Sequence, residues 1–125
     1  MGASGHGVIL IVDDDEAIRE AVQLALETEG YETALATQGA EALVWLGEHP
    51  TPGLVLLDLM MPVMDGWAVI EDLRQKDRLF QMPIVVITAF GRDLGSAANL
   101  PLLRKPIELA TLMTAVRQHC RATAR

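Results

Sequence analysis

The strongest constraint on the fold is an alternation between short apolar runs and longer segments whose apolar residues recur with the period of a helix. The short runs cover residues 8–12, 31–36, 54–58, 84–88 and 102–104. The helix-period segments cover residues 16–29, 40–48, 67–75 and 107–120. Runs that are apolar throughout are typical of strands buried on both faces. The alternation therefore predicts an α/β fold, in which a doubly wound five-stranded parallel sheet forms a three-layer sandwich with its helices.

Acidic residues stand where two of these strands end. Asp13, Asp14 and Asp15 follow the first strand, and Asp58 closes the third. Right-handed crossovers bring the carboxyl ends of parallel strands to one edge, so we expect these carboxylates to converge. A close pair of carboxylates costs about 4 kcal/mol at a separation of about 4 Å, which favours a bound cation. Since Mg²⁺ takes oxygen ligands and joins carboxylates to phosphates, the cluster predicts a magnesium site for phosphoryl chemistry.

Two further polar residues are expected at the same edge. Thr88 ends the fourth strand and Lys105 follows the fifth. A hydroxyl and an ammonium beside a metal-binding carboxylate cluster suit the transfer of a phosphoryl group, because that reaction depends mainly on positioning and charge neutralisation.

Length, charge and cysteine content narrow the class of protein. We expect residues 1–7 to be a disordered leader, residues 8–121 a single domain and residues 122–125 a tail. The net charge of −7 argues against nucleic-acid binding through this domain, since phosphate contacts need clustered Lys and Arg. The lone Cys120 favours a reducing compartment. Without an apolar stretch of membrane-spanning length or a signal peptide, the expected location is cytoplasmic, with no membrane contact.

Four motifs resemble the receiver domain of bacterial two-component response regulators, which has a CheY-like, flavodoxin-like fold. They are Ile-Leu-Ile-Val-Asp-Asp-Asp at 9–15, Leu-Leu-Asp-Leu-Met-Met-Pro-Val-Met-Asp-Gly at 56–66, Val-Ile-Thr-Ala at 86–89 and Lys105-Pro106. They follow one another in the order of that family, and the resemblance extends from about Val8 to Cys120.

The resemblance implies that Asp58 accepts a phosphoryl group from a histidine kinase or phosphotransfer protein, and that the domain then regulates an unidentified downstream partner. Mg²⁺ would be bound by Asp13, Asp14, Asp58 and the backbone carbonyl of Met60, with Asp13 acting through water. The resemblance further implies that Lys105, before a cis peptide bond to Pro106, pairs with the phosphoryl oxygens, and that Thr88 hydrogen-bonds one of them. Such a domain is no ordinary enzyme, because it catalyses only its own phosphorylation and dephosphorylation.

The chain departs from the family between Thr88 and Lys105. This stretch is shorter than usual and contains Gly91, Gly95, Asn99 and Pro101, so we expect the fourth helix of the fold to be short, distorted or replaced by a loop. Leu102 stands where the family usually has an aromatic residue that rotates on phosphorylation. We therefore predict no phosphorylation-dependent dimer through the fourth helix, fifth strand and fifth helix.

Two other functions stay open. A receiver-like interaction module that never needs phosphorylation would have the same fold. A haloacid-dehalogenase-like phosphatase would use Asp13 and Asp15, although Ala17 stands where that class has Thr or Val. The preferred interpretation of Asp15 is a cap of the helix that begins near Glu16. Within the phospho-accepting interpretation, the bulky Met60 and Phe90 predict slow self-hydrolysis, because apolar side chains over the phosphoryl group would hinder an attacking water.

Overall fold

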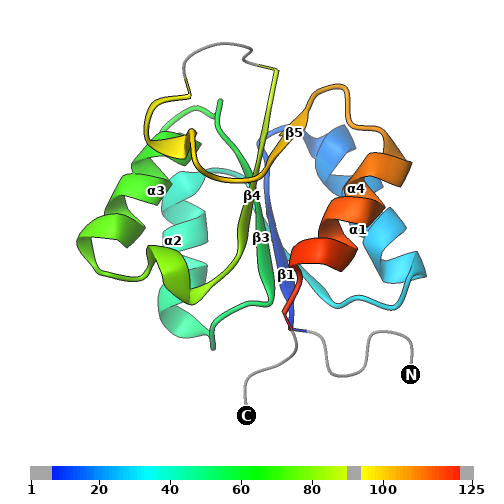
Figure 1. Ribbon diagram of the computed structural model, residues 1–125, viewed down its shortest axis with the longest axis horizontal. Coiled ribbons are helices and arrows are strands. Elements are labelled where there is room, and N and C mark those ends of the chain that lie inside the picture. The colour runs from blue at the N-terminus through cyan, green and yellow to red at the C-terminus, as the bar shows by residue number, and fades with distance from the viewer. Residues whose placement is uncertain (1–6, 90–93, 122–125) are drawn as a thin grey trace.

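The protein is a three-layer α/β sandwich, seen here in a computed structural model that describes residues 7–89 and 94–121. The strands β1 (Ile9–Val12), β2 (Thr33–Ala36), β3 (Leu54–Asp58), β4 (Ile84–Thr88) and β5 (Leu102–Arg104) form one parallel sheet in the order β2-β1-β3-β4-β5. Helices α1 (Glu16–Thr28) and α4 (Leu109–His119) cover one face, and α2 (Gly39–Glu48) and α3 (Gly66–Gln75) cover the other (Figure 1). The predicted doubly wound parallel sheet is confirmed.

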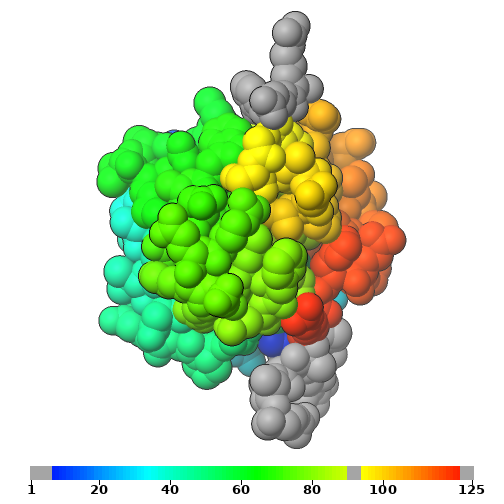
Figure 2. Space-filling model, turned by 60° about the vertical axis from the view of Figure 1, so that its left-hand side comes forward, coloured from blue at the N-terminus to red at the C-terminus, as the bar shows by residue number. Residues whose placement is uncertain are grey.

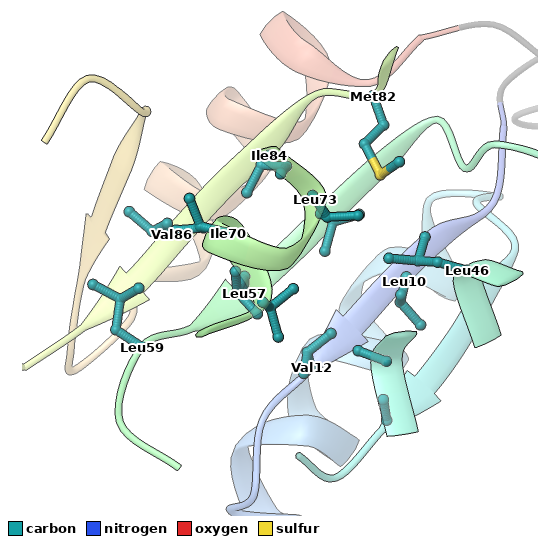
Figure 3. Packing of buried hydrophobic residues seen from close by; sticks show 14 of the residues in the cluster. Leu10, Val12, Leu46, Leu57, Leu59, Ile70, Leu73, Met82, Ile84 and Val86 are labelled. Atoms are coloured by element: carbon teal, nitrogen blue, oxygen red, sulfur yellow. The ribbon is translucent and has the colours of Figure 1, made fainter. Parts of the chain in front are cut away.

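Alternate residues of the central strands supply the two halves of the core, because successive side chains of a strand point to opposite faces. Leu10 and Val12 of β1 pack toward α2 and α3, together with Leu57 of β3 (Figure 3). Ile9 and Ile11 pack toward α1 and α4. All four residues of β1 and all five of β3 are buried, as expected for the inner strands of such a sheet. The strands are therefore rigid supports for the residues that follow them.

Local signals set the ends of the helices. Asp15 caps α1 by accepting a hydrogen bond from the backbone N–H of Ile18 at 3.1 Å, which agrees with its reading as a cap. After α1, Gly30 adopts a φ of 90°, and the N–H of Tyr31 still donates to the carbonyl of Leu26 at 3.0 Å. Because Tyr31 remains bound to the helix end, β2 begins at Thr33 and not at residue 31 as the sequence predicted.

The last helix differs from its prediction at its first turn. The helical period of residues 107–120 predicts a helix over this whole range with Leu109, Leu112 and Val116 on its inward face, but α4 begins at Leu109. Ile107 packs against the core cluster beneath α1 and α4, and this leaves the side chain of Leu109 57% exposed. The predicted inward orientation of Leu109 is therefore wrong, whereas Leu112 and Val116 are buried as expected.

The connection between β4 and β5 lacks a regular helix in its described part. Residues 94–101 contain one helical element, the 3₁₀ turn η2 (Gly95–Ala97), and residues 90–93, with Phe90, lie outside the described residues. A second 3₁₀ turn, η1 (Leu79–Gln81), precedes β4. The expected reduction of the fourth helix to a short or distorted element agrees with η2.

The two ends of the described chain meet at the edge of the sheet opposite the carboxyl ends of the strands. Gly7 donates its N–H to the carbonyl of Arg121, and Arg121 donates to the carbonyl of Gly53, both at 2.9 Å. Gly7, which the sequence grouped with the leader, is therefore buried against the domain. The rest of the predicted leader, residues 1–6, and the predicted tail, residues 122–125, lie outside the described residues. Within the described part of the chain, no helix has the length and apolar character needed to cross a bilayer.

Candidate functional site: an acidic cluster with one lysine

Three carboxylates converge where β1 and β3 end. β1 and β3 are hydrogen-bonded neighbours, so Asp13, directly after β1, and Asp58, the last residue of β3, lie side by side. Both are 1% exposed, whereas Asp14 is open to solvent. One oxygen from each of the three carboxylates lies within 4.8 Å of the other two. The predicted convergence is thus found, and like charges at this spacing need a compensating cation.

Lys105 enters this cluster from the strand two places away. Its Nζ lies 3.1 Å from Oδ2 of Asp58 and 3.2 Å from Oδ2 of Asp13. Its backbone N–H donates to the carbonyl of Thr88 at 3.0 Å, which holds the end of β5 against β4, and its peptide bond to Pro106 is cis as expected. Three carboxylates and one ammonium leave an excess of two negative charges, which matches the charge of a divalent cation.

Hydrogen bonds orient two of the carboxylates and leave one buried oxygen unused. Oδ1 of Asp13 accepts from the N–H of Asp15 at 2.9 Å, and Oδ1 of Asp58 accepts from the N–H of Met60 at 3.1 Å. Oδ2 of Asp13 is buried and accepts no hydrogen bond from the described residues, although Nζ of Lys105 is near it. Because buried oxygens normally have a partner, this atom fits a metal ligand, directly or through a bound water.

Burial and charge shift the ionisation of the central pair. Burial is the largest influence on Asp58 and, together with the charge of Asp13, it raises the pKa of Asp58 from 3.8 to about 6, against the opposing effects of the Met60 N–H and Lys105. Burial also acts to lower the pKa of Lys105, but the carboxylates of Asp58 and Asp13 outweigh it and raise that pKa above its ordinary value. Lys105 therefore stays charged, and Asp58 is ionised at neutral pH at a cost in stability.

The remaining predicted residues lie at the same edge of the sheet. Thr88 ends β4 and is fully buried beside the end of β3, since its neighbour Ile87 pairs with Asp58. Met60 follows Asp58 by two positions and has a 55% exposed side chain. Asp65 caps α3 by accepting a hydrogen bond from the N–H of Ala68 at 2.9 Å, and it is not among the three clustered carboxylates.

One contact of the site, made by Arg19, was not predicted from the sequence. Nη1 of Arg19, in the second turn of α1, donates to the backbone carbonyl of Asp13 at 2.8 Å and so holds the turn that presents Asp13 and Asp14. The signal available in the sequence was a positively charged residue near the start of a helix that follows an acidic turn. It is not specific, because the same charge serves equally well on a solvated helix face.

A family model identifies this arrangement. The model of the response regulator receiver domain matches residues 9–117, which is most of the chain and includes Asp13, Asp58, Thr88 and Lys105. The chain belongs to the response regulator receiver domain family. The receiver domain is a signalling module of two-component systems and not a conventional enzyme.

Curated relatives of this receiver domain are longer proteins. The DNA-binding dual master transcriptional regulator RpaA of Synechocystis sp. is 35% identical over 123 residues, which cover 94% of this chain and 50% of that protein. The response regulator MprA of Mycobacterium sp. is 38% identical over 124 residues, which cover 93% of this chain and 51% of that protein. The chain thus spans about half the length of these relatives.

Solved receiver structures share the fold over nearly their whole length. The chemotaxis protein CheY4 of Vibrio cholerae superposes with a TM-score of 0.80 at 28% identity, covering 91% of this chain and 98% of that one. The response regulator TrrA of Thermotoga maritima, solved in complex with Mg²⁺-BeF, superposes with a TM-score of 0.79 at 31% identity, covering 90% and 97%. The receiver domain of the hybrid histidine kinase CckA superposes with a TM-score of 0.77 at 32% identity, covering 90% and 98%.

Proposed function

We propose that this receiver domain accepts a phosphoryl group on Asp58 from the phosphohistidine of a histidine kinase or phosphotransfer protein and then regulates a downstream protein. One observation carries the proposal: a carboxylate that is 1% exposed lies among two further acids, with an ammonium 3.1 Å from one of its oxygens. A buried acid whose pKa is raised to about 6 by burial and a neighbouring carboxylate is typical of functional sites. Family membership and the single cysteine support the cytoplasm as the compartment, and we propose residues 8–121 as the domain.

The proposed reaction is a direct displacement. An oxygen of Asp58 forms a bond to phosphorus, the P–N bond of the donor breaks, and its electron pair stays on the imidazole nitrogen that leaves. The phosphoryl group is negatively charged and approaches a cluster of carboxylates, so the reaction needs cations at the site to reduce the repulsion. Of the described residues, Lys105 contributes such a charge at 3.1 Å from Asp58.

The three carboxylates fit Mg²⁺. Asp13, Asp14, Asp58 and the backbone carbonyl of Met60 would hold the ion. The buried Oδ2 of Asp13, which contacts Lys105 at 3.2 Å but accepts no hydrogen bond from the described residues, supports this assignment. When bound, Mg²⁺ supplies charge neutralisation and a fixed position for the phosphoryl oxygens. The hydrogen bonds from the N–H groups of Asp15 and Met60 keep the carboxylates oriented for that ion before it arrives.

Lys105 and Thr88 complete the proposed site. Lys105 would pass from its contact with the Asp58 carboxylate to the phosphoryl oxygens, which lie farther from the strand end. Thr88, on the neighbouring strand, would move toward the phosphoryl group and donate a hydrogen bond from its hydroxyl to one phosphoryl oxygen. This movement would shift the equilibrium between two conformations of the segment that follows Thr88.

The proposal is tested by the mass of the intact protein after incubation with acetyl phosphate and Mg²⁺. We expect a gain of one phosphoryl group, about 80 Da, that requires the metal and is lost in Asp58→Asn. Asp77→Asn is the matched control, because Asp77 is exposed, lies outside the cluster and has a φ of 55° that asparagine adopts readily. Equal phosphorylation of Asp58→Asn and wild type would contradict the assignment of the acceptor.

In the described residues 94–101 of the β4–β5 connection, η2 stands in place of a regular helix, and this favours one alternative, a receiver-like module that binds partners without phosphorylation. Such a module would bind Mg²⁺ but gain no mass with acetyl phosphate or with a phosphorylated kinase domain. The phosphatase alternative is not carried forward, because Asp15 is engaged as the cap of α1 and the chain belongs to the receiver family.

We further propose that the phosphorylated form hydrolyses slowly. The side chain of Met60 lies two positions beyond Asp58 and is bulky and apolar; Phe90, its predicted counterpart after β4, lies outside the described residues. Met60→Ser combined with Phe90→Ser should lose its phosphoryl group faster than the wild type, because water reaches phosphorus more easily. The rate is measured by the decay of the 80 Da mass gain, and an unchanged rate would refute the hindrance.

A further inference from the structure

A tryptophan ties the shortened β4–β5 connection to the helix that begins beside the acceptor aspartate. Nε1 of Trp67, the second residue of α3, donates to the backbone carbonyl of Leu94 at 2.6 Å, although the two residues are 27 positions apart in the chain. Gly95, at φ 56°, lies beside the indole, and a Cβ on it would be in ordinary van der Waals contact with Nε1 at 3.8 Å. The start of η2 therefore contacts the indole ring of Trp67.

More than one contact holds this segment to α3. Nη2 of Arg74, two turns further along α3, donates to the carbonyl of Ser96 at 3.3 Å. Ala97 is fully buried, and Leu94 and Leu100 pack against the core cluster beneath α2 and α3. Figure 2 shows residues 94–100, in yellow, lying directly against α3, in green. A regular fourth helix would pack on the sheet by itself. In this protein, residues 94–100 are held by their contacts with α3.

The start of α3 is equally tightly fitted to the acceptor. The N–H of Gly66 donates to the carbonyl of Leu59 at 3.1 Å. A Cβ on Gly66 would stand 2.5 Å from the carbonyl oxygen of Asp58, so the backbones of Asp58 and Gly66 are in direct contact. Trp67 follows Gly66 in the chain, so its indole ring is carried by a helix start that is held against the Asp58 backbone.

The same segment is joined by the chain to Thr88, six residues before Leu94. The Trp67–Leu94 hydrogen bond thus lies between the two residues that would respond to a phosphoryl group: Asp58 through the start of α3, and Thr88 through the chain that follows β4. Leu102 cannot supply an aromatic ring that rotates between states, and Trp67 offers a different connection.

We propose that Trp67 is the positioning residue that couples the state of Asp58 to residues 94–100, through its hydrogen bond to Leu94. The proposal rests on the proposed phosphorylation of Asp58. Movement of Thr88 toward the phosphoryl group draws the connection away from α3, which is fixed against the Asp58 backbone. The hydrogen bond between Trp67 and Leu94 is the contact that this displacement breaks or re-forms.

Hydrogen exchange of residues 94–100 measures the coupling, because the N–H groups of Ala97, Ala98 and Leu100 are hydrogen-bonded within this segment. In the wild type we expect their exchange to change on adding Mg²⁺ and beryllofluoride, a phosphoryl mimic. Trp67→Phe keeps an aromatic ring but removes the donor. It should exchange about fivefold faster without the mimic, the effect of losing one neutral hydrogen bond, and show no further change with it.

Trp45→Phe is the matched control, because Trp45 lies on α2 and stacks on His49 with ring centroids 4.2 Å apart, away from the connection. This control should respond to the mimic as the wild type does, and its remaining tryptophan, Trp67, should change its fluorescence. A purely structural role of Trp67 would speed exchange equally in both states and leave their ratio unaltered. The same ratio in Trp67→Phe and wild type would overturn the coupling.

The mass of the intact protein tests the phosphorylation of Asp58 separately from the coupling through Trp67. Wild type and Trp67→Phe should both gain one phosphoryl group from acetyl phosphate, since Trp67 does not touch the reacting atoms. A wild type that gains no mass would overturn the proposed function. A wild type that gains the mass while the exchange of residues 94–100 and the fluorescence of Trp67 stay unchanged would overturn the coupling alone.

Discussion

Replacing Asp58, the proposed acceptor, by its neutral isostere asparagine should make the metal-free domain more stable at neutral pH. Asp58 is buried and ionised there, although burial and the charge of Asp13 favour its protonated form. Asp58→Asn removes that charge and keeps the shape of the side chain. Lys105 is not left without a counter-charge in the variant, because its Nζ still lies 3.2 Å from Asp13.

The magnitude follows from the pKa of Asp58. A rise from 3.8 to about 6 corresponds to about 3 kcal/mol, at about 1.4 kcal/mol for each pKa unit. The side chain of Lys105 is 20% exposed and Asp14 is open to solvent, so water at the rim screens part of this energy. We therefore expect Asp58→Asn to raise the free energy of unfolding by about 1–3 kcal/mol at pH 7.

The pH dependence has a defined sign. Between about pH 4 and pH 6 the folded chain holds a proton on Asp58 that the unfolded chain has released, so the free energy of unfolding of the wild type falls as the pH rises through this window. The advantage of Asp58→Asn should therefore be small near pH 4 and complete above pH 6. Mg²⁺ should reduce it at pH 7, because a ligand held at 100 times its dissociation constant stabilises the folded wild type by about 2.7 kcal/mol.

Urea unfolding followed by circular dichroism, at several pH values with and without Mg²⁺, measures these differences. Asp77→Asn is again the control and should stay within about 0.5 kcal/mol of the wild type at every pH. If Asp58→Asn is no more stable than the wild type at pH 7, or if its advantage does not depend on pH, the reasoning from the buried charge is refuted.

Three further predictions concern the backbone and the assembly of the domain. Val63 is 90% exposed with φ 67°, in a strained γ-turn closed by a hydrogen bond from the N–H of Met64 to the carbonyl of Pro62. Val63→Gly should therefore raise the free energy of unfolding, measured with urea, by about 0.5–1 kcal/mol, whereas Val44→Gly on α2 should lower it. Gly66→Ala should lower the free energy of unfolding by about 2 kcal/mol or more and slow phosphorylation, because the added Cβ would meet the Asp58 carbonyl. Gly47→Ala is its control: a Cβ there meets nothing within 4 Å, so urea unfolding should show a gain of about 0.5–1 kcal/mol from the better helix former. In sedimentation with Mg²⁺ and beryllofluoride, the domain should form no dimer through residues 94–100, β5 and α4, and a phosphorylation-dependent dimer on that face would contradict this.

Most of the fold could be predicted because its buried strands carry a strong signal. β3 and β4 were predicted with the bounds that the structure has, since every residue in them is buried and a polar residue ends each one. The errors lie at element ends, where tertiary packing decides. Leu109 satisfies the helical period of α4, but the period does not show that Ile107 already covers the core beneath it.

Sequence reasoning brought the site residues to one edge because strand order and parallel direction determine where strand ends meet. It could not give contacts that depend on a side chain crossing between elements. Arg19 reaches the carbonyl of Asp13, and Trp67 reaches Leu94, and in both cases the side chain is also an ordinary choice for a helix surface. The φ of Val63 was equally hidden, because a β-branched residue is the opposite of what a positive φ favours.

The meeting of Gly7 with Arg121 has a consequence for how such a domain is used. Both residues lie at the amino edge of the sheet, beside Gly53, whereas Asp58 lies at the far end of β3, about 15 Å away at the rise of a β-strand. Polypeptide attached before Gly7 or after Arg121 therefore starts on the side of the domain away from the acidic cluster, with the two attachment points next to each other. The domain can therefore be placed at the front, at the back or in the middle of a longer chain without blocking access to the acidic cluster, as an exchangeable part in modular proteins.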